Sequence, residues 1–181
     1  MIYLNKQHGF TLVETAVVLV IIGLVMGGII KATEFIENGR ADRFIKDMKG
    51  FQGAYYGFNI KRGRYPGDMN GNKHINYDAV GINDGIFFQD LFDAGLTDSY
   101  EPEVPVENAG YYFANFLSIT ESTGLLTGTI RGKSQICATE VKDKYARHLD
   151  SKLDDGLHNT GIVRSLTAYG LIDRHTVCYQ L

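Results

Sequence analysis

Residues 10–30 form an apolar stretch of 21 residues with a single charged side chain, Glu14. A helix of this length rises about 31 Å, which is close to the thickness of about 30 Å of a bilayer's hydrocarbon core. The stretch is longer than the apolar region of a secretory signal peptide, which has about 7–15 residues. Residues 15–30 carry no charge at all, which is unusual for a buried helix of a soluble protein. The sequence therefore predicts a helix that inserts into a membrane.

Glu14 is a candidate functional residue because a carboxylate in a membrane segment costs on the order of 2.5–3.5 kcal/mol. It lies four residues after Phe10. If the chain were cut between Gly9 and Phe10, the new amine would lie about one helical turn from this carboxylate, and the two charges could neutralise each other within one chain or between neighbours. The alternative is a glutamate that reaches the membrane interface and favours the positive end of the helix dipole.

The sequence Gly-Phe-Thr-Leu-Val-Glu at residues 9–14 follows a short polar leader and precedes the apolar stretch. In this context it resembles the type IV prepilin signal of type IV pilins, competence pilins and type II secretion pseudopilins. The resemblance is close over about the first 30 residues. It implies that a prepilin peptidase cleaves after Gly9 and methylates the new amine of Phe10. It also implies that Glu14 guides assembly with other subunits on an inner-membrane platform.

The resemblance implies a pilin-like α+β fold, in which a long N-terminal hydrophobic helix packs on a C-terminal antiparallel β-sheet domain. Residues 1–9 would be the leader peptide, and residues 10–30 the transmembrane and assembly half of the helix. Residues 31–62 would form its amphipathic half, since apolar side chains recur there at intervals of three to seven. Residues 63–181 would form the globular domain.

Two opposing indications bear on the orientation in the membrane. The leader has one firm cation, Lys6, whereas five lie just beyond the apolar stretch, so the positive-inside rule would place the C-terminal side in the cytoplasm. The resemblance instead implies a single-pass inner-membrane precursor with a periplasmic globular domain, which later enters a pilus or pseudopilus and can reach the cell surface. We follow the resemblance, because four acidic residues are interspersed among those cations.

Composition and motifs bear on the class of function. The net charge is −3 for the whole chain and −4 without the leader, which argues against a nucleic-acid partner bound over the whole surface. A DNA contact through Lys61, Arg62 and Arg64 is the alternative. The histidines are scattered, and the sequence motifs of metalloproteases, serine hydrolases and nucleotide-binding enzymes are absent, so we expect no enzyme.

The two cysteines, Cys137 and Cys178, are too few and too far apart for a zinc site. In an oxidising compartment they are expected to form a disulfide, which would stabilise the fold by roughly 3–4 kcal/mol. The resemblance adds weight, because pilins often carry such a bond near the C-terminus. Two buried free thiols are the alternative.

A Gly- and Asn-rich segment from Asp68 onward has the alternating oxygen ligands that open a calcium-binding loop. Its sixth position is Lys73 rather than Gly, and its twelfth is Ala79 rather than Glu, so it is not an EF-hand. No cofactor is expected, and a surface turn is the preferred interpretation. Calcium remains an alternative, with these candidate ligands: Asp68, Asn70, Asn72 and Asp78.

Five further elements are predicted from pattern. Pro66-Gly67 suits a type II turn after the long helix. The other predictions are a short helix at 86–96 ending at Gly95, a hairpin from 110–119 and 125–131, a helix at 139–153 followed by Gly156, and a strand at 176–180.

The expected function is that of a filament-forming structural subunit. The alternatives are a type II secretion pseudopilin, or a minor or tip pilin in DNA uptake or adhesion. A remoter alternative is an envelope-anchored binding module that never polymerises.

Overall fold

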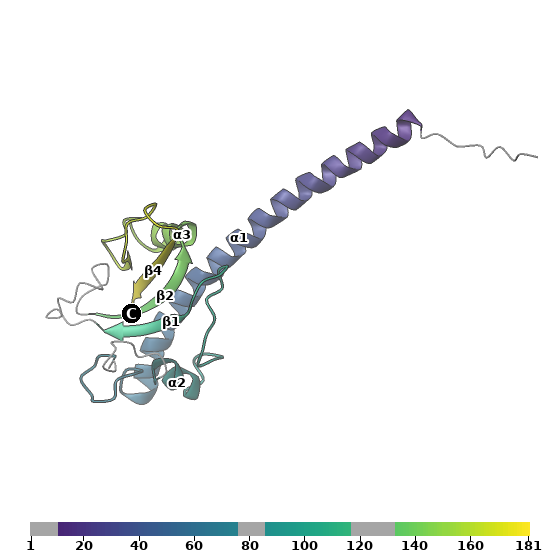
Figure 1. Cartoon of the computed structure of the whole chain (residues 1–181). Helices are drawn as coiled ribbons and strands as arrows, with labels where there is room; N and C mark the ends of the chain where they lie inside the picture. The colour runs from purple at the N-terminus through teal and green to yellow at the C-terminus, as the bar shows by residue number, and fades with distance from the viewer. Residues whose placement is uncertain (1–10, 76–85, 117–132) are drawn as a thin grey trace, which may run out of the picture. The chain divides into compact units, whose positions relative to one another are not determined.

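The computed structural model describes residues 11–75, 86–116 and 133–181 (Figure 1). The chain divides into two compact units, Met1–Gly39 and Arg40–Leu181. The elements in chain order are α1 (Leu12–Arg62), α2 (Ile86–Asp93), β1 (Tyr112–Phe116), β2 (Ser134–Lys142), α3 (Asp143–Leu153), β3 (Val163–Ser165) and β4 (Arg174–Gln180). The predicted α+β class is confirmed, with a long N-terminal apolar helix and a four-stranded antiparallel sheet.

The first unit consists, among its described residues, of the N-terminal part of α1. Its side chains face solvent almost without exception, and Leu12, for example, is 88% exposed. No proline interrupts the chain between residues 10 and 65. A continuous helix suits an apolar environment, because every interior N–H and C=O group is satisfied within the segment itself.

The second unit is built on the C-terminal part of α1, whose buried side chains recur every three or four residues. They are Ala41, Phe44, Met48, Phe51, Ala54, Tyr55 and Phe58. This stripe packs in one core with the sheet residues Ile136, Val177 and Tyr179. The predicted stripe over residues 31–62 is therefore confirmed from Ala41 onward, whereas Phe35 lies in the first unit and is 75% exposed.

The sheet has the strand order β1-β2-β4-β3, and all its pairs are antiparallel. Ala114, Ile136, Tyr179 and Val163 stand opposite one another across the four strands and belong to the main core. The predicted final strand is confirmed, and it begins two residues earlier, at Arg174. Polar contacts tie this strand to α1, since Gln52 donates to the carbonyl of Gln180 at 3.0 Å and accepts from the Tyr179 hydroxyl at 3.0 Å.

The prediction of a helix over 139–153 was wrong at its start, because β2 continues to Lys142 and α3 begins at Asp143. A bulge between Ala138 and Val141 lets the strand resume, with Val141 opposite His175. Pairing with β4 gives this segment's backbone groups hydrogen-bond partners in the sheet. That gain outweighs the helix preference indicated by its four-residue apolar spacing. Gly156 has a φ of 78° and lies two residues beyond the helix C-cap at Asp154.

The predicted hairpin is only partly described. Strand β1 falls within its first half, and its second half, 125–131, lies outside the described residues. The described partner of β1 is β2, from Ser134 to Lys142, whose first part was not predicted as a strand. Residues 134–138 are buried without alternation, so they lack the period-two pattern of a half-buried strand.

The predictions for the turn and for α2 are confirmed. Asp68 N–H donates to the Tyr65 carbonyl at 3.2 Å, and Gly67 between them has a φ of 76°, as a type II turn requires. Helix α2 is followed by Gly95 with a φ of 68°, and the Leu96 N–H bonds back to the Leu91 carbonyl at 2.9 Å. Such a bond is typical of a Schellman motif at a helix end.

Candidate assembly site and features of the C-terminal unit

Glu14 forms a capping box with Thr11 at the start of α1. Its Oε2 atom accepts from the backbone N–H and from the hydroxyl of Thr11, both at 2.8 Å. The Thr11 hydroxyl oxygen in turn accepts from the Glu14 N–H at 3.3 Å. This reciprocal pairing satisfies two N–H groups that a helix start otherwise leaves without partners. Gly9 and Phe10, the predicted cleavage and methylation positions, lie outside the described residues.

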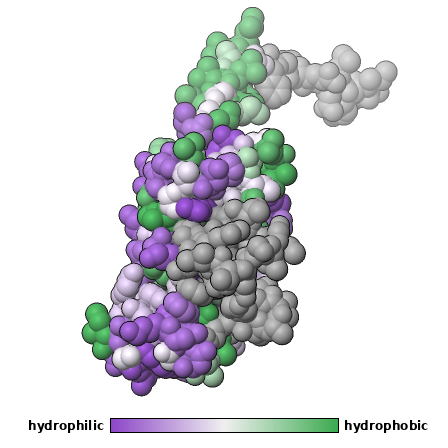
Figure 2. Space-filling model, turned by 90° about the vertical axis from the view of Figure 1, so that its left-hand side faces the viewer, coloured by the Kyte–Doolittle hydropathy of each residue, from purple (hydrophilic) through white to green (hydrophobic). Residues whose placement is uncertain are grey.

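Around Glu14, the surface of α1 is apolar. Among the described residues, this helix is long and apolar enough to cross a membrane. Figure 2 shows hydrophobic residues, in green, along this part of the helix. The Thr11–Glu14 pair thus lies on a largely apolar surface, where the neighbouring Thr15 hydroxyl is itself bonded to the Leu12 carbonyl at 2.9 Å.

Cys137 and Cys178 form a disulfide between β2 and β4. The two residues are direct partners in the strand register, and Phe113 on β1 stands opposite Cys137. These three residues make a small buried cluster separate from the main core. The bond therefore joins the two central strands and fixes the strand that ends at the C-terminus.

Residues 4–30 match the sequence model of the prokaryotic N-terminal methylation motif. The match indicates a type IV prepilin-like protein. It covers the Gly-Phe-Thr-Leu-Val-Glu sequence and the apolar stretch behind it, and it leaves the C-terminal unit uncovered. Comparisons with curated proteins and with solved structures found no match.

The apolar N-terminal helix fits the membrane anchoring that is typical of prepilins. The methylation-motif match does not extend to the C-terminal unit, so the candidate side chains of this unit are assessed from their contacts in the structure.

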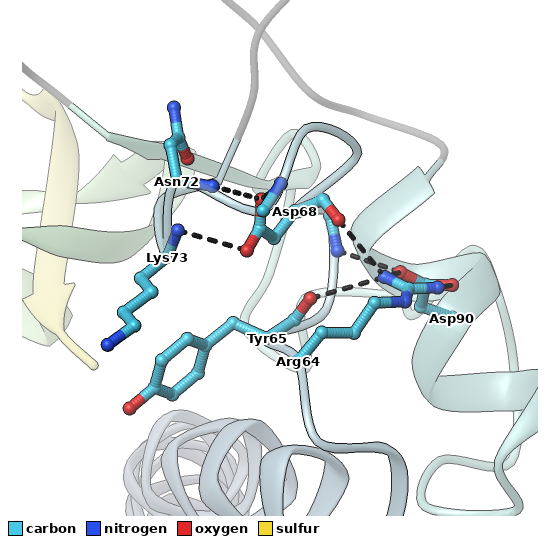
Figure 3. A network of polar contacts seen from close by, with 8 residues as sticks. Arg64, Tyr65, Asp68, Asn72, Lys73 and Asp90 are labelled. Atoms are coloured by element: carbon cyan, nitrogen blue, oxygen red, sulfur yellow. Dashed lines mark hydrogen bonds and ion pairs between the residues drawn. The ribbon is translucent and has the colours of Figure 1, made fainter.

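In the loop after α1, three of the four candidate calcium ligands act as hydrogen-bond acceptors for the loop's own backbone (Figure 3). Asp68 is buried, and its carboxylate accepts from the N–H groups of Gly71, Asn72 and Lys73 at 2.8–3.1 Å. Asn70 and Asn72 each accept from the N–H two residues ahead. These are Asx turns, which agrees with the preferred interpretation of the segment. The fourth candidate, Asp78, lies outside the described residues.

Two of the three cations considered for DNA contact are engaged with the protein. Arg64 makes a two-pronged ion pair with Asp90 on α2, with both N···O distances at 2.7 Å (Figure 3). Lys61 donates to the carbonyl of Ala94 at 2.5 Å, just beyond the end of α2. Both side chains hold α2 against the end of α1, and Asp90 also accepts from the Gly67 N–H at 2.8 Å. Arg62 is exposed.

Three carboxylates gather at the end of α3: Asp150, Asp154 and Asp155 have oxygen atoms within 4.8 Å of one another. Each organises the segment that leads to β3. Asp154 accepts from the N–H groups of Ile162 and Val163, and Asp155 accepts from the Thr160 hydroxyl. Sequence reasoning did not place Asp150 beside Asp154 and Asp155.

Asp150 is the buried member of this group. It accepts from the Tyr169 hydroxyl at 2.7 Å and from the Gly156 N–H at 3.1 Å. Burial raises its pKa, and the charges of Asp154 and Asp155 act in the same direction, against the lowering effect of the two hydrogen bonds. The folded state therefore disfavours a negative charge at this position.

A serine, a histidine and an aspartate line up inside the C-terminal unit. Ser165 Oγ lies 3.0 Å from His175 Nδ1, and His175 Nε2 lies 2.9 Å from Asp143 Oδ1. A catalytic serine must reach a substrate, but Ser165 is 0% exposed and His175 is buried. The arrangement instead joins β3, β4 and the first turn of α3. The sequence did not reveal it, because the three residues belong to separate elements.

Proposed function

We propose that this prepilin-like protein is a filament-forming structural subunit rather than an enzyme. In this proposal a prepilin peptidase cleaves after Gly9 and methylates Phe10, and the subunit then assembles through its N-terminal helix. The observation that carries the proposal is the methylation-motif match at residues 4–30, at the start of an apolar helix whose side chains are exposed. Such a surface needs a bilayer or the helices of neighbouring subunits to cover it.

Glu14 is the proposed assembly residue. Among the described hydrogen bonds, those that the Glu14 carboxylate accepts all end on Oε2. The other oxygen, Oε1, can therefore accept a hydrogen bond from another donor. The methylated amine of a neighbour's Phe10 is a suitable donor, because a charge-assisted hydrogen bond neutralises both groups in an apolar environment. Thr11 holds the carboxylate at the helix start while that partner approaches.

We further propose the arrangement that follows from this mechanism. The leader is 1–9, the transmembrane and assembly half of the helix is 10–30, the amphipathic half is 31–62, and the globular domain is 63–181. The precursor lies in the inner membrane, with an assembly platform as partner and the globular domain in the periplasm. The disulfide supports this location, because structural disulfides persist in oxidising compartments.

The experiment compares Glu14→Ala with the wild type in cells that contain the peptidase. A matched control is Glu34→Ala, which removes an exposed carboxylate of the same helix that pairs with Lys31. We expect all three proteins to be cleaved, and only Glu14→Ala to be lost from the assembled fraction. Normal assembly of Glu14→Ala would refute the role of this residue.

The same fractions distinguish a pilus subunit from a pseudopilin or minor pilin. Abundant protein in filaments sheared from the cell surface would indicate a main pilus subunit. Cleaved protein that stays with the envelope would indicate a pseudopilin or a minor pilin. Uncleaved protein in the envelope would favour an anchored module that does not polymerise.

A further inference from the structure

Two neighbouring aliphatic side chains are exposed on the loop between β3 and β4. Leu171 is 77% exposed and Ile172 is 44% exposed. They follow Gly170, whose φ of 82° turns the chain at this point. Single exposed apolar residues are common on protein surfaces, whereas adjacent ones on a loop form a small apolar projection that can contact a membrane or another protein. We call Leu171 and Ile172 the apolar tip.

The apolar tip is fastened to the first turn of α3 on both sides. The Gly170 N–H donates to Asp143 Oδ1 at 2.8 Å. The Asp143 N–H in turn donates to the Asp173 carbonyl at 2.8 Å. The carbonyl of Ile172 lies 3.1 Å from His175 Nε2, which adds a third contact within the loop. The tip is therefore held in its exposed position before it meets a partner, which lowers the entropic cost of binding.

The apolar tip lies at the end of the C-terminal unit where α1 enters it (Figure 1). Strand β4 begins next to the tip, at Arg174, and runs to Gln180, whose carbonyl accepts from Gln52 on α1 at 3.0 Å. Helix α3, to which the tip is fastened, approaches α1 ten residues earlier, where His148 Nε2 lies 3.9 Å from Asp42 Oδ1. Strand β4 therefore leads from the tip towards the opposite end of the unit.

This end of the unit is the one that the chain joins to the apolar stretch. Ten residues of α1 lead from Ile30 to Arg40, which is about 15 Å of helix. The headgroup layer of a bilayer occupies about 5–8 Å of that length beyond the hydrocarbon core. A helix tilt of about 20°, which is usual in membranes, shortens the remaining distance. A bilayer that holds residues 10–30 is therefore within reach of a loop at this end.

We propose that the apolar tip inserts into the headgroup layer of the membrane while the precursor is anchored there. This inference rests on the proposed membrane anchoring of residues 10–30. Two side chains alone bind a bilayer weakly, but the anchor turns their contact into an intramolecular step with a high effective concentration. The contact orients the C-terminal unit on the membrane, and it is released when the subunit leaves the bilayer for a filament.

The contact is apolar rather than electrostatic. Lys144 and Arg147 are exposed on α3 beside the loop, but Arg147 pairs with Asp143 at 2.7 Å, and Asp173 is exposed next to the tip. Cations and carboxylates thus occur together around the tip, which gives no strong preference for anionic lipids. We therefore expect the same contact with neutral phosphatidylcholine, and little change at about 1 M salt, where the Debye length is about 3 Å.

The test exploits the absence of tryptophan from the sequence. Leu171→Trp introduces a single indole at the tip of the full-length precursor, which is reconstituted in phosphatidylcholine vesicles. Brominated phosphatidylcholine quenches the fluorescence of an indole that enters the bilayer. We expect at least about twofold quenching and an emission maximum at shorter wavelength than in water. Emission at the wavelength of an indole in water, without quenching, would overturn the proposal.

Two further positions calibrate the signal. Ile60→Trp is the matched control, because Ile60 is an exposed aliphatic residue near the other end of the α1 segment in the same unit. It carries the same preference of indole for membrane interfaces, and it should not be quenched. Equal quenching at positions 60 and 171 would contradict insertion through the tip. Leu24→Trp lies in the apolar stretch and should be quenched strongly.

The Leu24→Trp variant also separates the two proposals. Quenching at position 24 without quenching at position 171 would overturn the tip contact and leave the membrane anchoring intact. Absence of quenching at position 24 would overturn the anchoring itself, and the tip contact with it.

A second substitution tests the apolar nature of the contact. Ile172→Ser in the Leu171→Trp background removes half of the apolar tip and should reduce quenching by at least about twofold. The matched control is Ile162→Ser, which changes an exposed isoleucine outside the tip and should leave quenching unchanged. Quenching that persists in Ile172→Ser, or that disappears in the wild-type loop background at about 1 M salt, would contradict an apolar contact.

Discussion

Loss of the Cys137–Cys178 bond should destabilise the C-terminal unit by an amount that follows from the chain it encloses. The two cysteines are 41 positions apart. In the chain-entropy model, closing a loop of this size stabilises the folded state by about 4 kcal/mol. For a unit of this length, that loss corresponds to a fall in Tm of about 10 °C. The bond joins two adjacent strands that already pair, so breaking it leaves the native hydrogen bonds in place.

The assay is thermal unfolding of the full chain in detergent, followed through the near-ultraviolet circular dichroism of its tyrosines. The oxidised protein is compared with protein that was unfolded, reduced and refolded, since reduction removes the bond without removing side-chain volume. The double variant Cys137→Ala/Cys178→Ala should unfold at the same temperature as the reduced protein or lower, because it also leaves a cavity beside Phe113. A fall in Tm below about 3 °C on reduction would refute the entropic reasoning.

Three further predictions concern the C-terminal unit. Arg64→Met should lower the unfolding free energy by about 1 kcal/mol, because Asp90 on α2 loses its ion-pair partner and keeps only the Gly67 N–H. Arg62→Met should change the unfolding free energy little in the same denaturant titration. Gly110→Ala should lower the unfolding free energy by about 1–3 kcal/mol, since the added carbon would lie 2.2 Å from the Thr139 hydroxyl. Adding Thr139→Ala to this variant should recover part of that loss. Equal stability of the single and double variants would contradict this contact. Burial raises the pKa of Asp150 above its ordinary value of 3.8. The neutral form of Asp150 therefore contributes stability that is complete below pH 3.8. That contribution is lost as the pH rises through the raised pKa. The wild type should therefore lose stability relative to Asp150→Asn between pH 3.5 and pH 7, and parallel pH profiles of the two proteins would contradict the shift.

The parts of the fold that follow from local chemistry could be predicted from the sequence. The Pro66-Gly67 turn needs only a positive φ at glycine, and the helix stop at Gly95 needs the same freedom. The start of α3 could not be predicted in this way. Val141 has helical spacing to Tyr145, but its pairing with His175 on a distant strand places it in the sheet.

The candidate site shows the same division. The Thr-x-x-Glu spacing of residues 11 and 14 is a readable capping box, a signal that is separate from the charge of Glu14. The contact of Ser165 with His175, by contrast, depends on which strands become neighbours.

The central claim is that the chain is cleaved after Gly9 and methylated on Phe10 before it assembles. The most direct test is the intact mass of the protein purified from cells that contain a prepilin peptidase. The account predicts a chain that lacks residues 1–9 and carries one added methyl group on its new N-terminus. A mature protein that keeps those residues, or begins at any other position, would contradict it.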